Sequence, residues 1–281
     1  MPVSYSAREY GYPDLIEFIL SGLRSGIRGR SVQGVFVLGL ALIAVAYLAA
    51  GFSPRQPRTV ALDVGFSGVR FTLILLSLFW VQDLVTREID RKIILHSLSL
   101  PVSRGAFLFG RYLAVLGLVG LAAGILALCL LLAVLLASPN YDQEFSVNMG
   151  WPFWLAIVGI VLDVAIVAAV ALALATVSTV SMLPLLVGAA FAIGGKALGA
   201  AVDYIAGGAG GDQELKNSIG PWLDIVRWVM PDLSRLDWRD GALYGAVPPG
   251  DAVAWAIVMA MAYVALVLGL GWRALDRREF G

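Results

Sequence analysis

Long runs of apolar residues alternate with short polar segments along most of the chain. A membrane-spanning helix needs about 20 mostly apolar residues, and six stretches meet this requirement. These stretches are residues 34–52, 64–85, 106–137, 151–177, 182–206 and 251–272. The pattern predicts an all-α membrane protein in which residues 1–281 form a single transmembrane domain with six transmembrane helices. Because six is an even number, both termini are expected on the same side of the membrane.

The segment before the first predicted span has the pattern of an amphipathic helix. Its apolar residues recur at helical spacing from Leu15 to Ile27, and Arg24, Arg28 and Arg30 follow at its polar end. We therefore expect an amino-terminal helix that lies along the membrane interface.

A second segment outside the predicted spans, residues 207–250, precedes the last span. It contains Trp222, Trp228 and Trp238, whose amphipathic rings favour the headgroup level of a bilayer. Two interpretations fit this composition. The segment is either a helical stretch that lies on the outer leaflet or a small cap that packs over the spans.

Composition excludes a soluble globular domain. Hydrophobic residues make up 59% of the chain and charged residues only 14%, whereas a soluble domain carries roughly 25% charged residues. The 20 Lys and Arg residues balance the 20 Asp and Glu residues, so no net charge attracts nucleic acid and we expect no nucleic-acid partner. One cysteine and one histidine exclude an internal disulfide framework and His-rich or Cys-rich metal sites.

The positions of the basic residues predict the orientation. They gather before the first span, between the second and third spans, and after the last span. Loops rich in Lys and Arg are retained in the cytoplasm. We therefore expect a multi-pass protein of the cytoplasmic (inner) membrane with both termini in the cytoplasm.

The loop between the second and third predicted spans is too long for a simple turn. It combines a charged cluster, a short apolar run and Pro-Val-Ser-Arg. Pro101 disfavours helix at the residue before it, so a short helix is expected to end there and the next helix to open near Arg104. The charged residues that this short helix would present to a soluble partner are Glu88, Asp90, Arg91 and Lys92.

Residues 88–112 resemble the type-2 exporter permeases of ATP-binding-cassette (ABC) transporters. The resemblance lies in the order of an acidic residue, a short apolar helix with spaced leucines, Pro-Val-Ser-Arg, and an aromatic-Gly-basic entry to the next span. One departure is Arg91-Lys92, where Gly-Thr is common in the family. The six spans, the amphipathic amino-terminal helix and the segment before the last span extend the resemblance more weakly along the chain.

The resemblance implies a partner and an architecture. Residues 86–104 would be the coupling helix that fits a cleft in a separate ATPase subunit. The residues that would make this contact are Glu88, Asp90, Arg91, Lys92, Pro101 and Arg104. A six-span permease implies a second permease copy, expected as a homodimer, and two ABC ATPase subunits, which would bind ATP and Mg.

This chain is not expected to be an enzyme or to bind a cofactor. A phosphate-binding loop needs G-x-x-x-x-G-K-[ST], and the nearest sequence, Gly194-Gly195-Lys196-Ala197, lacks the first glycine and the hydroxyl residue. The chain also lacks H-E-x-x-H, the motif of a metalloprotease.

Charged residues within the predicted spans are candidate functional groups, because burying a charge in the bilayer is costly. Asp163 and Lys196 fall at depths that differ by only about 3 Å at the helical rise, so we expect them to meet. Asp203 lies seven residues after Lys196 and is a second possible partner, and Arg70 is expected to extend outward to the interface.

Three interpretations are open for this membrane-embedded polar site. Asp163 and Lys196 form a structural ion pair between the fourth and fifth spans, line part of a polar substrate path, or are unpaired and near water. If they relay protons, the chain would instead be a proton-coupled secondary transporter, which is the alternative function.

Overall fold

The computed structural model describes residues 15–27, 29–53, 55–86, 104–137, 146–178, 180–206 and 230–277, and every regular element in these ranges is helical. The long helices are α2 (Arg30–Gly51), α3 (Pro57–Val81), α6 (Arg104–Leu136), α7 (Trp151–Val177), α8 (Leu183–Ala206) and α11 (Gly250–Arg277). The short elements are α1 (Leu15–Ile27), the π-helical turn η1 (Gln82–Thr86), the 3-10 helix η2 (Leu233–Leu236) and α10 (Arg239–Leu243).

Among the described residues, five helical stretches are long and apolar enough to cross a membrane. They are Val32–Gly51, Pro57–Leu84, Gly105–Leu136, Trp151–Val177 and Gly250–Arg277. The apolar part of α8 is shorter and spans Leu183–Gly199. Since several helices have the length and composition of spans, the chain has the structure of an all-α, multi-pass membrane protein.

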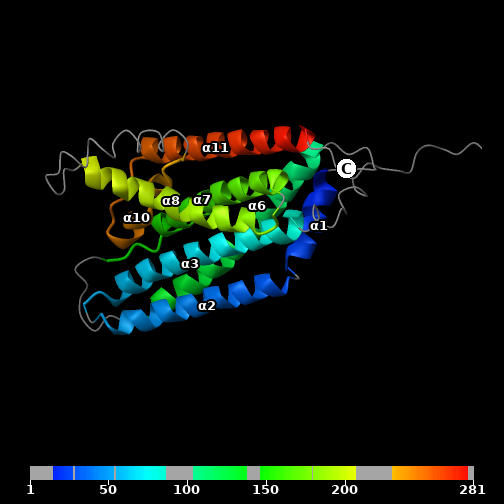
Figure 1. Cartoon of the computed structure of the whole chain (residues 1–281). Helices are drawn as coiled ribbons and strands as arrows, with labels where there is room; N and C mark the ends of the chain where they lie inside the picture. The colour runs from blue at the N-terminus through cyan, green and yellow to red at the C-terminus, as the bar shows by residue number, and fades with distance from the viewer. Residues whose placement is uncertain are drawn as a thin grey trace, which may run out of the picture.

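The long helices lie side by side in an elongated bundle (Figure 1). Helix α7 packs against α3, α6, α8 and α11, and most of its residues are buried. Helix α2 lies at one edge against α3 and α6, and α11 lies on the other side of the bundle against α7 (Figure 1). The outward faces of these edge helices carry large exposed apolar side chains, which suits contact with lipid.

The two ends of the bundle carry different elements (Figure 1). Helix α1, the beginning of α6 and the end of α11 lie together at one end, here called the α1 end. The beginnings of α3 and α11 and the short helix α10 lie at the opposite end, here called the α10 end. The described part of the chain therefore begins and ends at the same end of the bundle.

Part of segment 207–250 packs as a cap. Residues 230–243, here called the cap, contain η2 and α10 and lie against α7, α8 and α3. Leu233, Leu236 and Trp238 are at most 5% exposed. For these residues the structure supports the packed interpretation over a helix lying on the leaflet, and residues 207–229 lie outside the described ranges.

Candidate functional site

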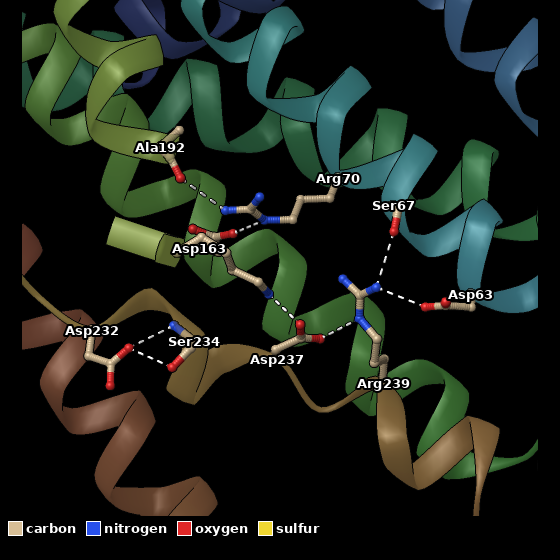
Figure 2. Close-up of polar contacts among 10 residues, drawn as sticks. Asp63, Ser67, Arg70, Asp163, Ala192, Asp232, Ser234, Asp237 and Arg239 are labelled. Carbon is tan, nitrogen blue, oxygen red and sulfur yellow. Dashed lines mark hydrogen bonds and ion pairs between the residues drawn. The ribbon is translucent and has the colours of Figure 1, made fainter. Parts of the chain in front are cut away.

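A cluster of charged side chains extends from the cap to α3 and α8 and on to α7 (Figure 2). We call it the polar cluster. Its charged members are Asp63 and Arg70 of α3, Asp163 of α7, Lys196 of α8, and Asp237 and Arg239 of the cap. Three cations and three carboxylates thus balance one another.

The deepest part of the cluster is the pair formed by Arg70 and Asp163. The Arg70 Nε donates a hydrogen bond to Asp163 Oδ2, and Arg70 Nη2 donates to the Ala192 carbonyl oxygen at 3.3 Å. The Asp163 side chain is only 4% exposed. The prediction that Arg70 extends outward to the interface is therefore wrong, because a buried carboxylate and a carbonyl dipole offer the guanidinium closer partners.

Asp163 keeps one oxygen without a protein partner. Its Oδ1 atom is buried and accepts no hydrogen bond from any described residue. A carboxylate oxygen in such a position favours a small donor such as a water molecule or a proton.

Lys196 bonds to the cap rather than to α7. Its Nζ donates to Oδ2 of Asp237, which lies two residues before α10. The predicted Asp163–Lys196 pair is therefore corrected: each residue has a different ion-pair partner. The prediction compared depth along the bundle and ignored both the direction of each side chain and the carboxylate supplied by the cap. The side chain of Asp203 on α8 lies outside the described side chains.

Arg239 connects Asp237 of the cap to two residues of α3. Its Nε donates to Asp237 Oδ1 at 2.8 Å, and its Nη1 donates to Asp63 Oδ1 at 2.9 Å and to Ser67 Oγ at 3.1 Å. Asp63, Ser67 and Arg70 are spaced by four and three residues, so they share one face of α3. One helix face thus contacts both the cap and α7.

Asp237 and Arg239, the two cap residues of the cluster, stabilise each other's charged forms. Burial alone would raise the pKa of Asp237, but hydrogen bonds from Lys196 and Arg239 and their positive charges outweigh burial and lower this pKa below its ordinary value. Burial opposes the charge on Arg239, yet hydrogen bonds to Asp237 and Asp63 raise its pKa. Both groups are therefore held in their charged forms.

Glycines on the spans let the cap approach closely. A Cβ atom at Gly159 of α7 would lie 2.2 Å from the Leu236 carbonyl oxygen, and one at Gly199 of α8 would lie 2.1 Å from Ser234 Oγ. Within the cap, Asp232 accepts hydrogen bonds from the backbone N–H and hydroxyl of Ser234. The cap is therefore held by shape as well as by charge.

The predicted coupling residues lie mostly outside the described ranges. Glu88, Asp90, Arg91, Lys92 and Pro101 fall in residues 87–103, of which the structure describes nothing. Arg104 is the first residue of α6, and its side chain also lies outside the described side chains.

The elements that flank this segment lie at the α1 end. Helix α1 contacts both η1 and α6, and α6 contacts α11, where Gly105 packs beside Trp272. Trp80 of α3 is 3% exposed and donates from Nε1 to the Gly26 carbonyl oxygen of α1 at 3.0 Å. The described elements on either side of residues 87–103, η1 and α6, therefore both contact the amphipathic helix α1.

Sequence reasoning missed Asp63, Ser67, Asp237 and Arg239. The spacing of Asp63 and Ser67 from Arg70 was a usable signal, because it places three polar residues on one face of an apolar helix. The sequence carries no equivalent signal for Asp237, whose role depends on the return of the cap to the spans.

The described residues contain no group of three or more His, Cys, Asp or Glu residues arranged to hold a metal ion. Chemically, the polar cluster can hold helices together, and Asp163 Oδ1 can accept a proton or a hydrogen bond from a water molecule. The chain matches no protein-family model, and it matches no curated protein.

Proposed function

We propose that this chain is the permease subunit of an ABC exporter, which moves substrate across the cytoplasmic membrane using ATP hydrolysed by a separate subunit. In this proposal α2, α3, α6, α7, α8 and α11 are six spans and both termini are cytoplasmic, so that the α1 end faces the cytoplasm. Two copies of the chain assemble with two ATPases that carry ATP and Mg.

The observation that carries the proposal is the location of η1 and the beginning of α6, which flank residues 87–103 in the sequence. Both elements contact the amphipathic helix α1 at the same end of the bundle. This is the place where a coupling helix meets an ATPase in the family that residues 88–112 resemble. The first and last described residues share this end (Figure 1), which agrees with an even number of crossings.

The polar cluster has a structural role in this proposal. It ties the cap to α8 through Lys196 and Asp237 and to α3 through Arg239 and Asp63, and the buried pair of Arg70 and Asp163 ties α3 to α7. Closing the α10 end in this way separates the interior of the bundle from the outside until the cap moves.

Assembly and hydrolysis test the proposal most directly. The purified chain is expected to hydrolyse no ATP, and co-expression with its cognate cassette ATPase is expected to give a complex with two copies of each subunit. Size-exclusion chromatography with light scattering measures the stoichiometry, and phosphate release measures hydrolysis. Sustained hydrolysis by the isolated chain, after contaminating ATPases are removed, would overturn the proposal.

A charge reversal tests the coupling segment. Glu88→Arg is expected to uncouple ATP hydrolysis from the permease while the membrane fold remains intact, because a charge at a contact surface affects association more than folding. Glu144→Arg, in the loop predicted on the opposite side of the membrane, is the matched control. If the two reversals change ATPase stimulation equally, Glu88 does not make the proposed contact with the ATPase.

The proton-coupled alternative has one supporting observation, the unpartnered Oδ1 of Asp163. It predicts proton flux through the chain alone in liposomes that contain a pH-sensitive dye, and loss of this flux in Asp163→Asn. The exporter proposal expects no flux in either protein. Flux that depends on Asp163 and needs no ATPase would favour the alternative.

A further inference from the structure

A cavity of about 380 Å³ lies near the α1 end, away from the polar cluster. Its walls come from three helices: Phe36 and Val37 of α2, Trp80 of α3, and Leu118 and Ile125 of α6. Nearly all of the lining is apolar. A volume of this size falls in the range of small-molecule sites.

The rim and the floor of the cavity differ in exposure. Val37 and Ile125 on the rim are 63% and 42% exposed, whereas Trp80 on the floor is 3% exposed. The rim side chains belong to apolar spans, so the solvent outside the cavity is the hydrocarbon of the bilayer. An occupant must therefore be a molecule that reaches the cavity from the lipid.

The end of the cavity nearest α1 has one polar lining residue, and a basic residue of α2 lies next to it, outside the lining. Gln33 lines it, and Arg30 lies three residues earlier on the same face of α2. Arg30 is exposed and makes no ion pair with any residue that the structure describes. Asp83 also lies at this corner, beside Gly29, and it has an interaction of its own. An apolar cavity thus ends at an available guanidinium.

We propose that this cavity binds an anionic phospholipid, with one acyl chain between α2 and α6 and the phosphate at Arg30. An acyl chain alone gains little by leaving bilayer hydrocarbon for an apolar cavity. Selectivity therefore arises at the headgroup, where the guanidinium donates charge-assisted hydrogen bonds to phosphate oxygens and Gln33 adds an amide donor. This site is independent of the partner ATPase and of the exporter proposal.

The number of retained lipids of each headgroup tests the proposed site. The protein is reconstituted in nanodiscs that contain equal amounts of phosphatidylglycerol and phosphatidylcholine, and retained lipids are counted by native mass spectrometry. The native chain is expected to retain phosphatidylglycerol preferentially. Arg30→Gln is expected to lower this preference about fivefold, the effect of one basic residue near an anionic surface, whereas Arg273→Gln on α11 at the same end is expected to leave it unchanged.

Filling the cavity tests whether it binds an acyl chain of the lipid. Val37→Phe and Ile125→Phe place a ring in the cavity from opposite walls and are expected to reduce retained lipid of both headgroups. Val45→Phe, which is on α2 outside the cavity and 52% exposed, is the matched control. Two filling variants keep the test usable if one fails to fold.

Trp80 gives a second measurement, because it lines the cavity yet is shielded from the surrounding bilayer. Phosphatidylglycerol with brominated chains is expected to quench the part of the fluorescence that is lost in Trp80→Phe, more than brominated phosphatidylcholine does. Three results would each overturn the proposal: equal retention of the two lipids, equal effects of Arg30→Gln and Arg273→Gln, or no quenching of Trp80.

Discussion

The two ends of the bundle each hold a non-spanning segment against the spans, but they do so by different physical means. At the α10 end the cap is tied by ion pairs in which Asp237, Arg239 and Lys196 take part. At the α1 end, helix α1 contacts α6 through Gly22 and Gly26. It accepts hydrogen bonds from Trp80 of α3 and from Arg111 of α6, whose Nη1 donates to Ser21 Oγ at 3.4 Å. Ion pairs add to close packing at the first contact, whereas close packing and hydrogen bonds hold the second.

This difference determines what can release each segment. Ion pairs weaken when a carboxylate is protonated and, where they are exposed, when salt screens them. Close packing of small residues has neither dependence, because it rests on shape and dispersion. The contact of the cap is therefore expected to respond to pH and salt, and the contact of α1 with α6 is expected to respond less.

The largest expected effect on stability comes from removing the Asp163 carboxylate. Asp163→Leu leaves Arg70 without its buried carboxylate and is expected to lower the free energy of unfolding by about 3–5 kcal/mol. Adding Arg70→Leu is expected to restore most of this loss, whereas adding Lys196→Leu is not, because Lys196 pairs with Asp237. Chemical unfolding in detergent micelles measures each free energy. Rescue by Lys196→Leu and not by Arg70→Leu would show that the pairing is wrong.

Two glycine substitutions test how much close packing contributes at each end of the bundle. Gly159→Ala places a Cβ 2.2 Å from a backbone oxygen of the cap, and Gly22→Ala places one 2.6 Å from the Ala114 Cβ of α6. Each clash is expected to cost about 1–3 kcal/mol, partly offset by the higher helix propensity of alanine. Gly34→Ala, which meets nothing within 4 Å, is the control and is expected to be neutral or slightly stabilising.

The measurement is again the free energy of unfolding, combined with a second substitution. Ala114→Gly is expected to relieve Gly22→Ala, because it removes the atom that clashes. The Gly159→Ala clash is with a main-chain carbonyl, so no side-chain substitution removes the clashing atom. If Gly34→Ala destabilises the protein as much as Gly22→Ala, close approach is not the cause.

The smallest expected effect is the pH dependence of the cap. The pKa of Asp237 lies below its ordinary value of 3.8 in the folded protein, so this group stabilises the fold above about pH 4. That stabilisation, about 1–2 kcal/mol for a half-buried charged hydrogen bond, is lost as the pH falls through the lowered pKa. Unfolding between pH 6 and pH 3 is therefore expected to show a smaller decrease in stability for Asp237→Asn than for the native chain. Parallel curves for the two proteins would contradict this assignment.

The sequence by itself determined the class of structure and the approximate location of the long helices. Apolar runs with almost no charge can satisfy their backbone polar groups in a bilayer only as helices. Helix α7 accordingly has the bounds of the fourth predicted span, Trp151 to Val177. Hydropathy is a local property, and it also singled out Asp163 and Lys196 as charges that need partners.

Only the tertiary structure decided which partners these charges have. Depth along a span follows from sequence, but the direction of a side chain around the bundle depends on how every helix is rotated and packed. Asp237 lies 41 residues after Lys196 and reaches it only because the cap returns to lie on Gly159 and Gly199. Trp80 shows the same limit, because only the packing of α1 against the end of α3 decides that its ring is buried.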